Sequence, residues 1–504
     1  MHARGLYNLV RSHEEIVLKK PLKILFVTSE VAPLMSTGGL ADVASALPQA
    51  LHAQGHDVRV IMPCFRSLSP GQRGEQLLTY AVEMGPRLVS GALRKTALPN
   101  TRVPLYLVEQ EAYFMRPHPY GSGAHEYPDN AERFSFFCAA TLEGIKRTGW
   151  HPDVVHCHDW HAAAVPALLK TRYEKDVFWG GTPSLFTIHN LAYQGRYSAD
   201  RFAATGLPAE LFTPEFLEFH GDFCLMKAGL VFSDKLSTVS PRYAREIQTA
   251  EYGVGLDGVL RHRAKDLHGI LNGVDYTIWN PAKDEHLEAN YDAANMAGKA
   301  ACKAALQRAL GLPVREVPVF GSVTRLFWQK GLDLVADAMP ELLRHDLQVV
   351  VQGTGDPEVE QRLQRWAAEF PEKISLVLKF DRALAHQVHG GSDFFLMPSR
   401  YEPCGLSQMY SFAYGNIPIV RRTGGLADTV VHLDPVHRKN ETSNGISFIP
   451  LTPQAITRAV VQAMGLYRTQ EFLEVQKRGM AADFSWEQSA KAYDALYRET
   501  IAAV

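Results

Sequence analysis

The sequence places two cations and a carboxylate directly after short apolar runs, where the strands of a buried sheet would end. Arg325 and Lys330 follow the run 317–323, and Glu402 follows 393–397. Ligands of open α/β sheets bind at such strand ends, and fixed cations can stabilise a diphosphate. The alternative is a pair of solvated surface cations and a glutamate in a surface turn. Gly331 next to Lys330 favours the functional interpretation of the cations.

Two glycine-containing turns repeat almost the same letters in the two halves of the chain. Thr-Gly-Gly-Leu-Ala-Asp occurs at 37–42, after the apolar run 24–27, and again at 423–428, after 417–420. Glycines let the backbone approach a ligand, and unpaired N–H groups at a helix start attract an anion. One such turn is a weak signal, because many are only structural. The repeat indicates two similar α/β units that face one cleft.

Two further polar residues follow expected strands, and each has two interpretations. His189 comes after 184–188 and is either a residue of the site or a satisfied histidine in a loop. Asp159 lies at a strand-to-helix junction and is either a helix cap or a sugar ligand. His156 and His158 share one face of a strand, without a second cluster at a zinc-like spacing. We expect no metal and no cofactor.

The elements that would position these residues are apolar runs that alternate with helical patterns, which is typical of α/β folds with parallel sheets. Residues 77–107 indicate an antiparallel hairpin, and 114–130 a long loop. The chain should therefore form two doubly wound, Rossmann-like domains. The expected strands are 23–29, 57–62, 103–108, 153–157, 183–188 and 235–239 in the first half, and 317–323, 347–352, 374–378, 393–397 and 417–420 in the second.

The length and the breaks in the pattern divide the chain into four segments. Residues 1–21 are a polar N-terminal extension, 22–272 the first Rossmann-like domain and 273–484 the second. Residues 485–504 form a last helix. Ser485 is its expected N-cap. The helix has an apolar stripe at helical spacing, formed by Trp486, Ala490, Tyr493 and Tyr497.

Composition excludes several classes of protein. The 504 residues carry 52 basic and 54 acidic side chains, a net charge of −2, which argues against a nucleic-acid footprint spread over the surface. No apolar run is long enough to span a membrane. The six cysteines are scattered without a C-x-x-C pair, which fits buried free thiols in a reducing compartment. We expect a cytoplasmic protein.

Together these motifs resemble the bacterial glycogen synthase and plant starch synthase family, which are retaining glucosyltransferases with the two-domain GT-B fold. The resemblance runs from Lys23 to Ala502. It rests on motifs that occur here in family order: T-G-G-L-A-D-V, H-x-H-D-W-H-A, H-N-L-A-Y-Q-G, S-T-V-S-P, I-L-N-G-V-D, R-L-x-W-Q-K-G, S-R-Y-E-P-C-G-L and R-T-G-G-L-A-D-T-V.

The resemblance implies transfer of glucose from ADP-glucose to the non-reducing end of an α-1,4-glucan such as glycogen. The first domain would hold the acceptor, the second the nucleotide sugar, and the last helix would cross back onto the first. The implied catalytic residues are Glu402, His189, Arg325 and Lys330. The implied donor-binding residues are Gly38, Gly39, Arg325, Lys330, Cys404, Thr423, Gly424 and Gly425. The implied sugar or acceptor residues are Asp42, Tyr120, Asp159 and Asn272.

Two positions depart from the pattern of retaining GT-B enzymes. Ser36 stands where the family usually has the lysine of Lys-Thr-Gly-Gly-Leu. The missing charge-assisted bond is worth about 1.5–3 kcal/mol, so either another cation compensates or donor use is altered; we predict weaker donor affinity than in lysine-bearing relatives. Tyr410, eight residues after Glu402, replaces a second glutamate found in other retaining GT-B enzymes but not in the close relatives.

Ser36 leaves two alternatives open. The first is a related glycosyltransferase that uses UDP-glucose or a small acceptor, such as glucose 1-phosphate or a maltooligosaccharide. The second is a glucan-binding protein without turnover. The presence of Arg325, Lys330 and Glu402 argues against the second alternative.

Overall fold

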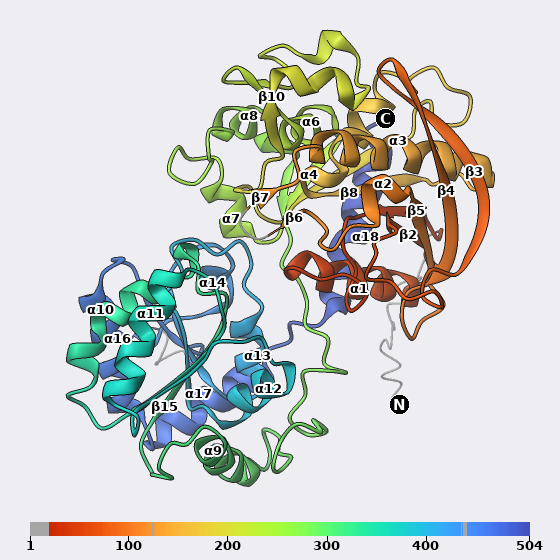
Figure 1. The fold of residues 1–504 in the computed structure, drawn as a ribbon. Coiled ribbons are helices and arrows are strands. Elements are labelled where there is room, and N and C mark those ends of the chain that lie inside the picture. Colours follow the sequence, from red (N-terminus) through yellow and green to blue (C-terminus); the bar gives the residue numbers. More distant parts are fainter. Residues whose placement is uncertain (1–19, 123–124, 435, 437–440) are drawn as a thin grey trace, which may run out of the picture.

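The computed structural model describes residues 20–122, 125–434, 436 and 441–504. The predicted N-terminal extension therefore lies almost wholly outside the described residues. Figure 1 shows two lobes, each built on its own sheet. The first lobe takes its sheet from the N-terminal half of the chain, and the second lobe from the C-terminal half.

The sheet of the first lobe has nine strands within the described residues, seven of them parallel. Strands β3 and β4 pair antiparallel at one edge and form the predicted hairpin. The spatial order is β14 (Leu267–Gly269), β13 (Lys235–Thr238), β9 (Ser184–Ile188), β8 (Val154–His158), β1 (Lys23–Val27), β2 (Asp57–Pro63), β5 (Pro104–Glu109), β4 (Arg87–Ala97) and β3 (Glu75–Met84).

Helices cover this sheet, and two small antiparallel sheets lie beside it. The predicted loop 114–130 contains the short strands β6 (Gly121–Ser122) and β7 (His125–Glu126). The other small sheet is formed by β10 (Arg196–Ser198), β12 (Asp222–Cys224) and β11 (Glu218–Phe219). The helices are α1 (Gly39–Ala53), α2 (Glu111–Phe114), α3 (Asn130–Thr148), α4 (Asp159–Ala162), α5 (Ala164–Leu169), α6 (Leu225–Phe232), α7 (Pro241–Glu246) and α8 (Asp257–His262).

The sheet of the second lobe has six described strands, all parallel. Their order is β17 (Ile374–Val377), β16 (Gln348–Gln352), β15 (Val319–Val323), β18 (Phe394–Met397), β19 (Ile417–Arg421) and β20 (Ile446–Phe448). The helices are α9 (Ala297–Ala309), α10 (Leu332–Leu342), α11 (Pro357–Glu369), α12 (Arg382–Gly391), α13 (Ser407–Ala413), α14 (Gly424–Thr429), α16 (Pro453–Leu466) and α17 (Gln470–Ala481).

The last helix, α18 (Trp486–Ala502), returns to the first lobe (Figure 1). Its predicted stripe is confirmed, because Trp486, Ala490, Tyr493 and Tyr497 are buried in the first lobe's core. Ser485 occupies the N-cap position, but its side chain makes no capping hydrogen bond. The helix is instead held by tertiary contacts with the first lobe.

The two chain crossings between the lobes lie side by side. Val274 and Ser485 form a parallel bridge, and the Val274 N–H donates to the Phe484 carbonyl at 2.7 Å. A little further along the chain, Trp279 stacks between His386 and Tyr410, with ring centroids 4.1 and 4.0 Å apart. The predicted boundaries, 272/273 and 484/485, fall at these crossings and stay predictions.

All eleven predicted strands are present, each within about two residues of its predicted bounds. The edge strands β14 and β20 were not predicted. They have only three residues each, too few for a period to be recognised. The two-sheet α/β fold is therefore confirmed, and the carboxyl ends of β1, β8, β15 and β18 carry the predicted polar residues.

Candidate active site

The buried carboxylate of Glu402 is fixed by a cation and a hydroxyl. Lys330 Nζ lies 2.9 and 2.7 Å from the two carboxylate oxygens, and Ser399 Oγ donates to Oε2 at 2.9 Å. Glu402 is only 5% exposed. Gly331 makes this approach possible: its φ is +72°, and a Cβ there would lie 2.2 Å from the Pro398 carbonyl oxygen. The sequence thus brings the loops after β15 and β18 together.

Arg325, the second predicted cation, is open to a ligand. Its side chain is exposed, and its guanidinium lies 5.4 Å from the Phe327 ring. No described residue forms an ion pair or hydrogen bond with it. Lys330 by contrast is committed to Glu402. Of the two predicted diphosphate cations, Arg325 is therefore the one that a donor could engage without breaking an internal bond.

The first glycine turn keeps its N–H groups open. Gly38 and Gly39 are exposed, and their N–H groups donate to no described acceptor. Thr37 is fixed by Glu30, which accepts from the Thr37 N–H and Oγ1, both at 2.6 Å. The start of the fifteen-residue helix α1 can therefore receive an anion. Leu406 of the second lobe lies 3.8 Å from where a Gly39 Cβ would be.

The second glycine turn is arranged differently from our expectation. The Gly424 N–H donates to Glu246 Oε2 at 2.9 Å, and Thr423 Oγ1 to the same oxygen at 3.1 Å. The Gly425 N–H lies 3.1 Å from the Glu402 carbonyl oxygen. The anion at this turn is thus the carboxylate of Glu246, from α7 in the other lobe. Donor binding by Thr423, Gly424 and Gly425 stays a prediction, and it would require this contact to open.

Tyr120 acts on the first glycine turn through Glu30. Its hydroxyl donates to Glu30 Oε1 at 2.6 Å and lies 2.9 Å from Ser29 Oγ. The ring packs on His161, with centroids 4.6 Å apart. The family resemblance implied a sugar-binding role for this residue but gave no sign of its bond to Glu30.

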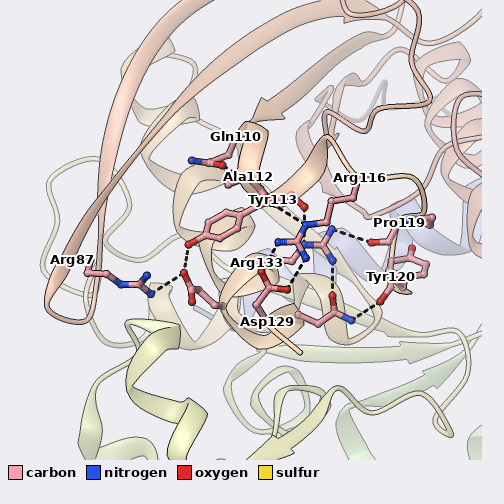
Figure 2. A network of polar contacts seen from close by, with 11 residues as sticks. Arg87, Gln110, Ala112, Tyr113, Arg116, Pro119, Tyr120, Asp129 and Arg133 are labelled. Atoms are coloured by element: carbon pink, nitrogen blue, oxygen red, sulfur yellow. Dashed lines mark hydrogen bonds and ion pairs between the residues drawn. The ribbon is translucent and has the colours of Figure 1, made fainter. Parts of the chain in front are cut away.

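Figure 2 shows the buried arginine that holds the loop of Tyr120. Arg133 donates to the carbonyl oxygens of Tyr113 at 2.7 Å and Pro119 at 3.1 Å, and also to Asn130 Oδ1. Burial lowers the pKa of Arg133 to about 10, so the side chain stays charged. Beside the network is an open hollow of about 700 Å³, whose lining includes Tyr113 but no predicted site residue.

We expect Tyr120→Phe to weaken ADP binding about tenfold, because Glu30 loses a charge-assisted hydrogen bond and no longer holds Thr37 firmly. Calorimetric titration with ADP measures this change. Tyr173→Phe, in the same lobe and away from this network, is the matched control. An unchanged dissociation constant in Tyr120→Phe would contradict a positioning role for Tyr120.

His189 and Asp159 meet at the ends of β9 and β8. The His189 N–H donates to Asp159 Oδ1 at 2.7 Å, and His189 Nε2 lies 2.9 Å from His158 Nδ1. Burial lowers the pKa of His189 to about 3, so the ring is neutral at physiological pH. Asp159 has a φ of +54°, an uncommon conformation outside glycine that is often found in functional sites. Both residues are buried beside the junction of the lobes.

Burial raises the pKa of the Asp159 carboxyl to about 7, and the backbone N–H groups of His189 and Asn190 oppose that rise. The folded pKa lies above the unfolded value, so the stabilising contribution is complete below about pH 4 and is lost as the pH rises through 7. The free energy of unfolding of the wild type should therefore fall between about pH 4 and 7 relative to Asp159→Asn. Urea unfolding at a series of pH values measures this difference; a constant difference would contradict it.

Asn272 and Cys404 join the two lobes next to Glu402. Burial raises the pKa of the Cys404 thiol to about 12, and the Asn272 backbone N–H opposes the rise by hydrogen bonding to the sulfur. The thiol is therefore protonated and is no nucleophile. The buried Asn272 Oδ1 has no hydrogen-bond partner among the described residues, and its role as a sugar ligand stays a prediction.

Asp42 lies at the same junction, exposed on the first turn of α1. Surrounding protein raises the pKa of its carboxyl to about 6; Arg382 of the second lobe opposes the rise, and Glu30 adds to it. The predicted site residues thus lie near the strand ends where the lobes meet. Tyr120 differs from the others, because it is linked to the first glycine turn only through Glu30.

Within the described residues, no group of histidine, cysteine, aspartate or glutamate side chains is arranged to hold a metal ion. All six cysteines are buried and free, as predicted. None of the helices in the described part of the chain is long and apolar enough to cross a membrane.

The chain has the architecture of a GT-B glycosyltransferase. It has two lobes with parallel sheets, a last helix that crosses between them, and a junction at Glu402, Lys330 and Arg325. The starch synthase catalytic domain model matches residues 23–262, and the glycosyl transferases group 1 model matches 307–476. The chain belongs to the glycogen synthase and starch synthase family.

Individual relatives cover nearly the whole chain. It is 49% identical to a glycogen synthase of Anaeromyxobacter sp. (strain Fw109-5), over 95% of this chain and 100% of that protein. It is 45% identical to a glycogen synthase of Moorella thermoacetica, over 96% and 98%. Among solved structures it is similar to the catalytic domain of starch synthase IV from Arabidopsis thaliana bound to ADP and acarbose, with a TM-score of 0.86, 33% identity, and coverage of 96% and 100%.

Proposed function

We propose that this protein transfers glucose from ADP-glucose to the non-reducing end of an α-1,4-glucan, with retention, and so elongates glycogen. The observation that carries the proposal is the assembly at the junction of the lobes. The buried Glu402 carboxylate is paired with Lys330, and Arg325 lies open beside the same strand ends. The ADP in the similar starch synthase structure supports an adenine nucleotide as donor.

The chemistry follows from charge placement. Cleavage of the glucosyl bond leaves negative charge on the diphosphate, which Arg325 and the open N–H groups of Gly38 and Gly39 are suited to stabilise. The oxocarbenium-like centre needs a nearby negative group, which Glu402 supplies. Because Glu402 is fixed by Lys330 and Ser399, we infer attack by the acceptor hydroxyl on the face from which the diphosphate leaves. A trapped glucosyl–enzyme adduct would contradict this.

The test is nucleoside diphosphate release by the purified protein, given ADP-glucose or UDP-glucose, with and without glycogen. We expect glycogen-dependent ADP release that is clearly faster than UDP release. Release only with UDP-glucose, or only with a small acceptor, would identify the related transferase instead. Glycogen binding without release from either donor would identify the glucan-binding protein.

A further inference from the structure

At the turn before α1, the first lobe presents backbone N–H groups to a nucleotide-sugar donor, but it presents no cation there. The segment 36–42 reads Ser-Thr-Gly-Gly-Leu-Ala-Asp and ends in the exposed Asp42. Glu30 bonds the Thr37 N–H and hydroxyl of the same turn, so the charged side chains on this side of the junction are acidic. A diphosphate at the open N–H groups of Gly38 and Gly39 would meet this negative charge. A cation from elsewhere must offset it.

Arg382 of the second lobe lies where it can supply this positive charge. It is the first residue of α12, one helical turn before His386, so the two side chains share a face. His386 stacks on Trp279, which stacks on Tyr410, so this face of α12 is directed to the junction. The charge of Asp42 raises the pKa of Tyr410, and the charge of Arg382 lowers it. Arg382 is also the charged group that most strongly lowers the pKa of Asp42.

Arg382 is also uncommitted. Its side chain is exposed, and no described residue forms a hydrogen bond or a close ion pair with it. Other arginines nearby are used internally: Arg400 makes a bidentate pair with Asp333, and Arg421 donates to the Arg400 carbonyl. Lys330 is bound to Glu402, whereas Arg325 and Arg382 are exposed cations of the second lobe that form no hydrogen bond or ion pair with a described residue.

We propose that Arg382 binds the donor diphosphate together with Arg325, and supplies from the second lobe the positive charge that Ser36 does not supply from the first. This proposal rests on the proposed function in one respect, namely that the donor carries a diphosphate. A diphosphate would then bridge the open N–H groups of α1 and the guanidinium of α12. Donor binding would draw the two lobes together.

The test is calorimetric titration of ADP into the wild-type protein, three variants and one control variant. We expect Arg382→Ala to weaken ADP binding about tenfold or more, because a charge-assisted bond is lost. Ser36→Lys in the Arg382→Ala background should recover most of that loss, whereas Ser36→Lys alone should gain only a few-fold. Arg458→Ala, an exposed arginine on α16, is the matched control.

Unchanged ADP affinity in Arg382→Ala would overturn the proposal, as would a loss that Ser36→Lys does not repair. The same titrations with UDP separate this proposal from the proposed donor. If the wild type binds UDP rather than ADP, the adenine assignment fails. The effect of Arg382→Ala on UDP then decides the role of the arginine, since the diphosphate is common to both ligands.

Discussion

Glu402→Gln is expected to lower kcat for glucosyl transfer by about 10²–10³-fold, since one preorganised charge at the reacting centre is removed. Glutamine can still accept from Lys330 and Ser399, which hold the carboxylate at 2.7–2.9 Å in the wild type. The variant loses some stability, because Lys330 loses its counter-charge, but it should still fold and bind ADP nearly as well as the wild type. Glycogen-dependent ADP release measures kcat, and titration measures binding.

The matched control is Glu372→Gln, an exposed glutamate between α11 and β17 whose side chain forms no hydrogen bond or ion pair with a described residue. It should leave both quantities unchanged. A Glu402→Gln variant that retains more than about a tenth of the wild-type kcat would refute the central role of this carboxylate, because the expected transition-state loss is larger than that. Lost ADP binding would instead indicate that Glu402 positions the donor.

Lys330→Met is expected to impair both stability and activity. Removing one partner of a buried ion pair leaves an uncompensated charge, at a typical cost of about 3–5 kcal/mol. Glu402 is buried and Lys330 mostly so, with side chains 6% and 18% exposed. Urea unfolding measures the free energy of unfolding, and kcat should also fall, because Glu402 is no longer held in place.

A double-mutant cycle separates the ion pair from a packing effect. In Lys330→Met with Glu402→Gln, the buried charge is gone, so most of the lost stability should return while activity stays low. Lys477→Met, an exposed position on α17, controls for the introduction of a methionine. If the double variant is as unstable as Lys330→Met alone, the loss comes from packing of the lysine stem rather than from the charge of Glu402.

Local patterns were sufficient to predict the fold, because buried parallel strands are short apolar runs and the turns after them contain glycine and polar residues. The apolar run 393–397 and the loop around Glu402 are one example, and the stripe of α18 is another. The positions of the site residues followed from topology, since parallel strands end at one edge. The edge strands β14 and β20 are too short to carry a pattern.

The partners of the site residues could not be predicted. Glu30, Glu246, Arg133 and Arg382 are ordinary charged residues in the sequence, without a motif around them. Glu246 contacts Gly424 across 178 residues, and no local period records such a pairing. A charged residue directly after β1 was the only signal that could have identified Glu30. The sequence also did not show that the N–H groups of Gly424 and Gly425 bond to oxygens of the protein itself, and donor binding at this turn stays a prediction.

The return of α18 has a consequence for synthesis of the chain. Tyr497 and His156 form a 2.8 Å hydrogen bond across 341 residues, and Tyr493 completes the same core. The first domain is made long before α18, so its core stays incomplete until α18 has been synthesised. About 225 residues separate the end of this domain, near residue 272, from Tyr497, so at about 5–20 residues per second the delay is roughly 10–45 s. During it, the groove that α18 later fills exposes apolar surface, so nascent chains should depend on chaperones until this helix has left the ribosome and packed.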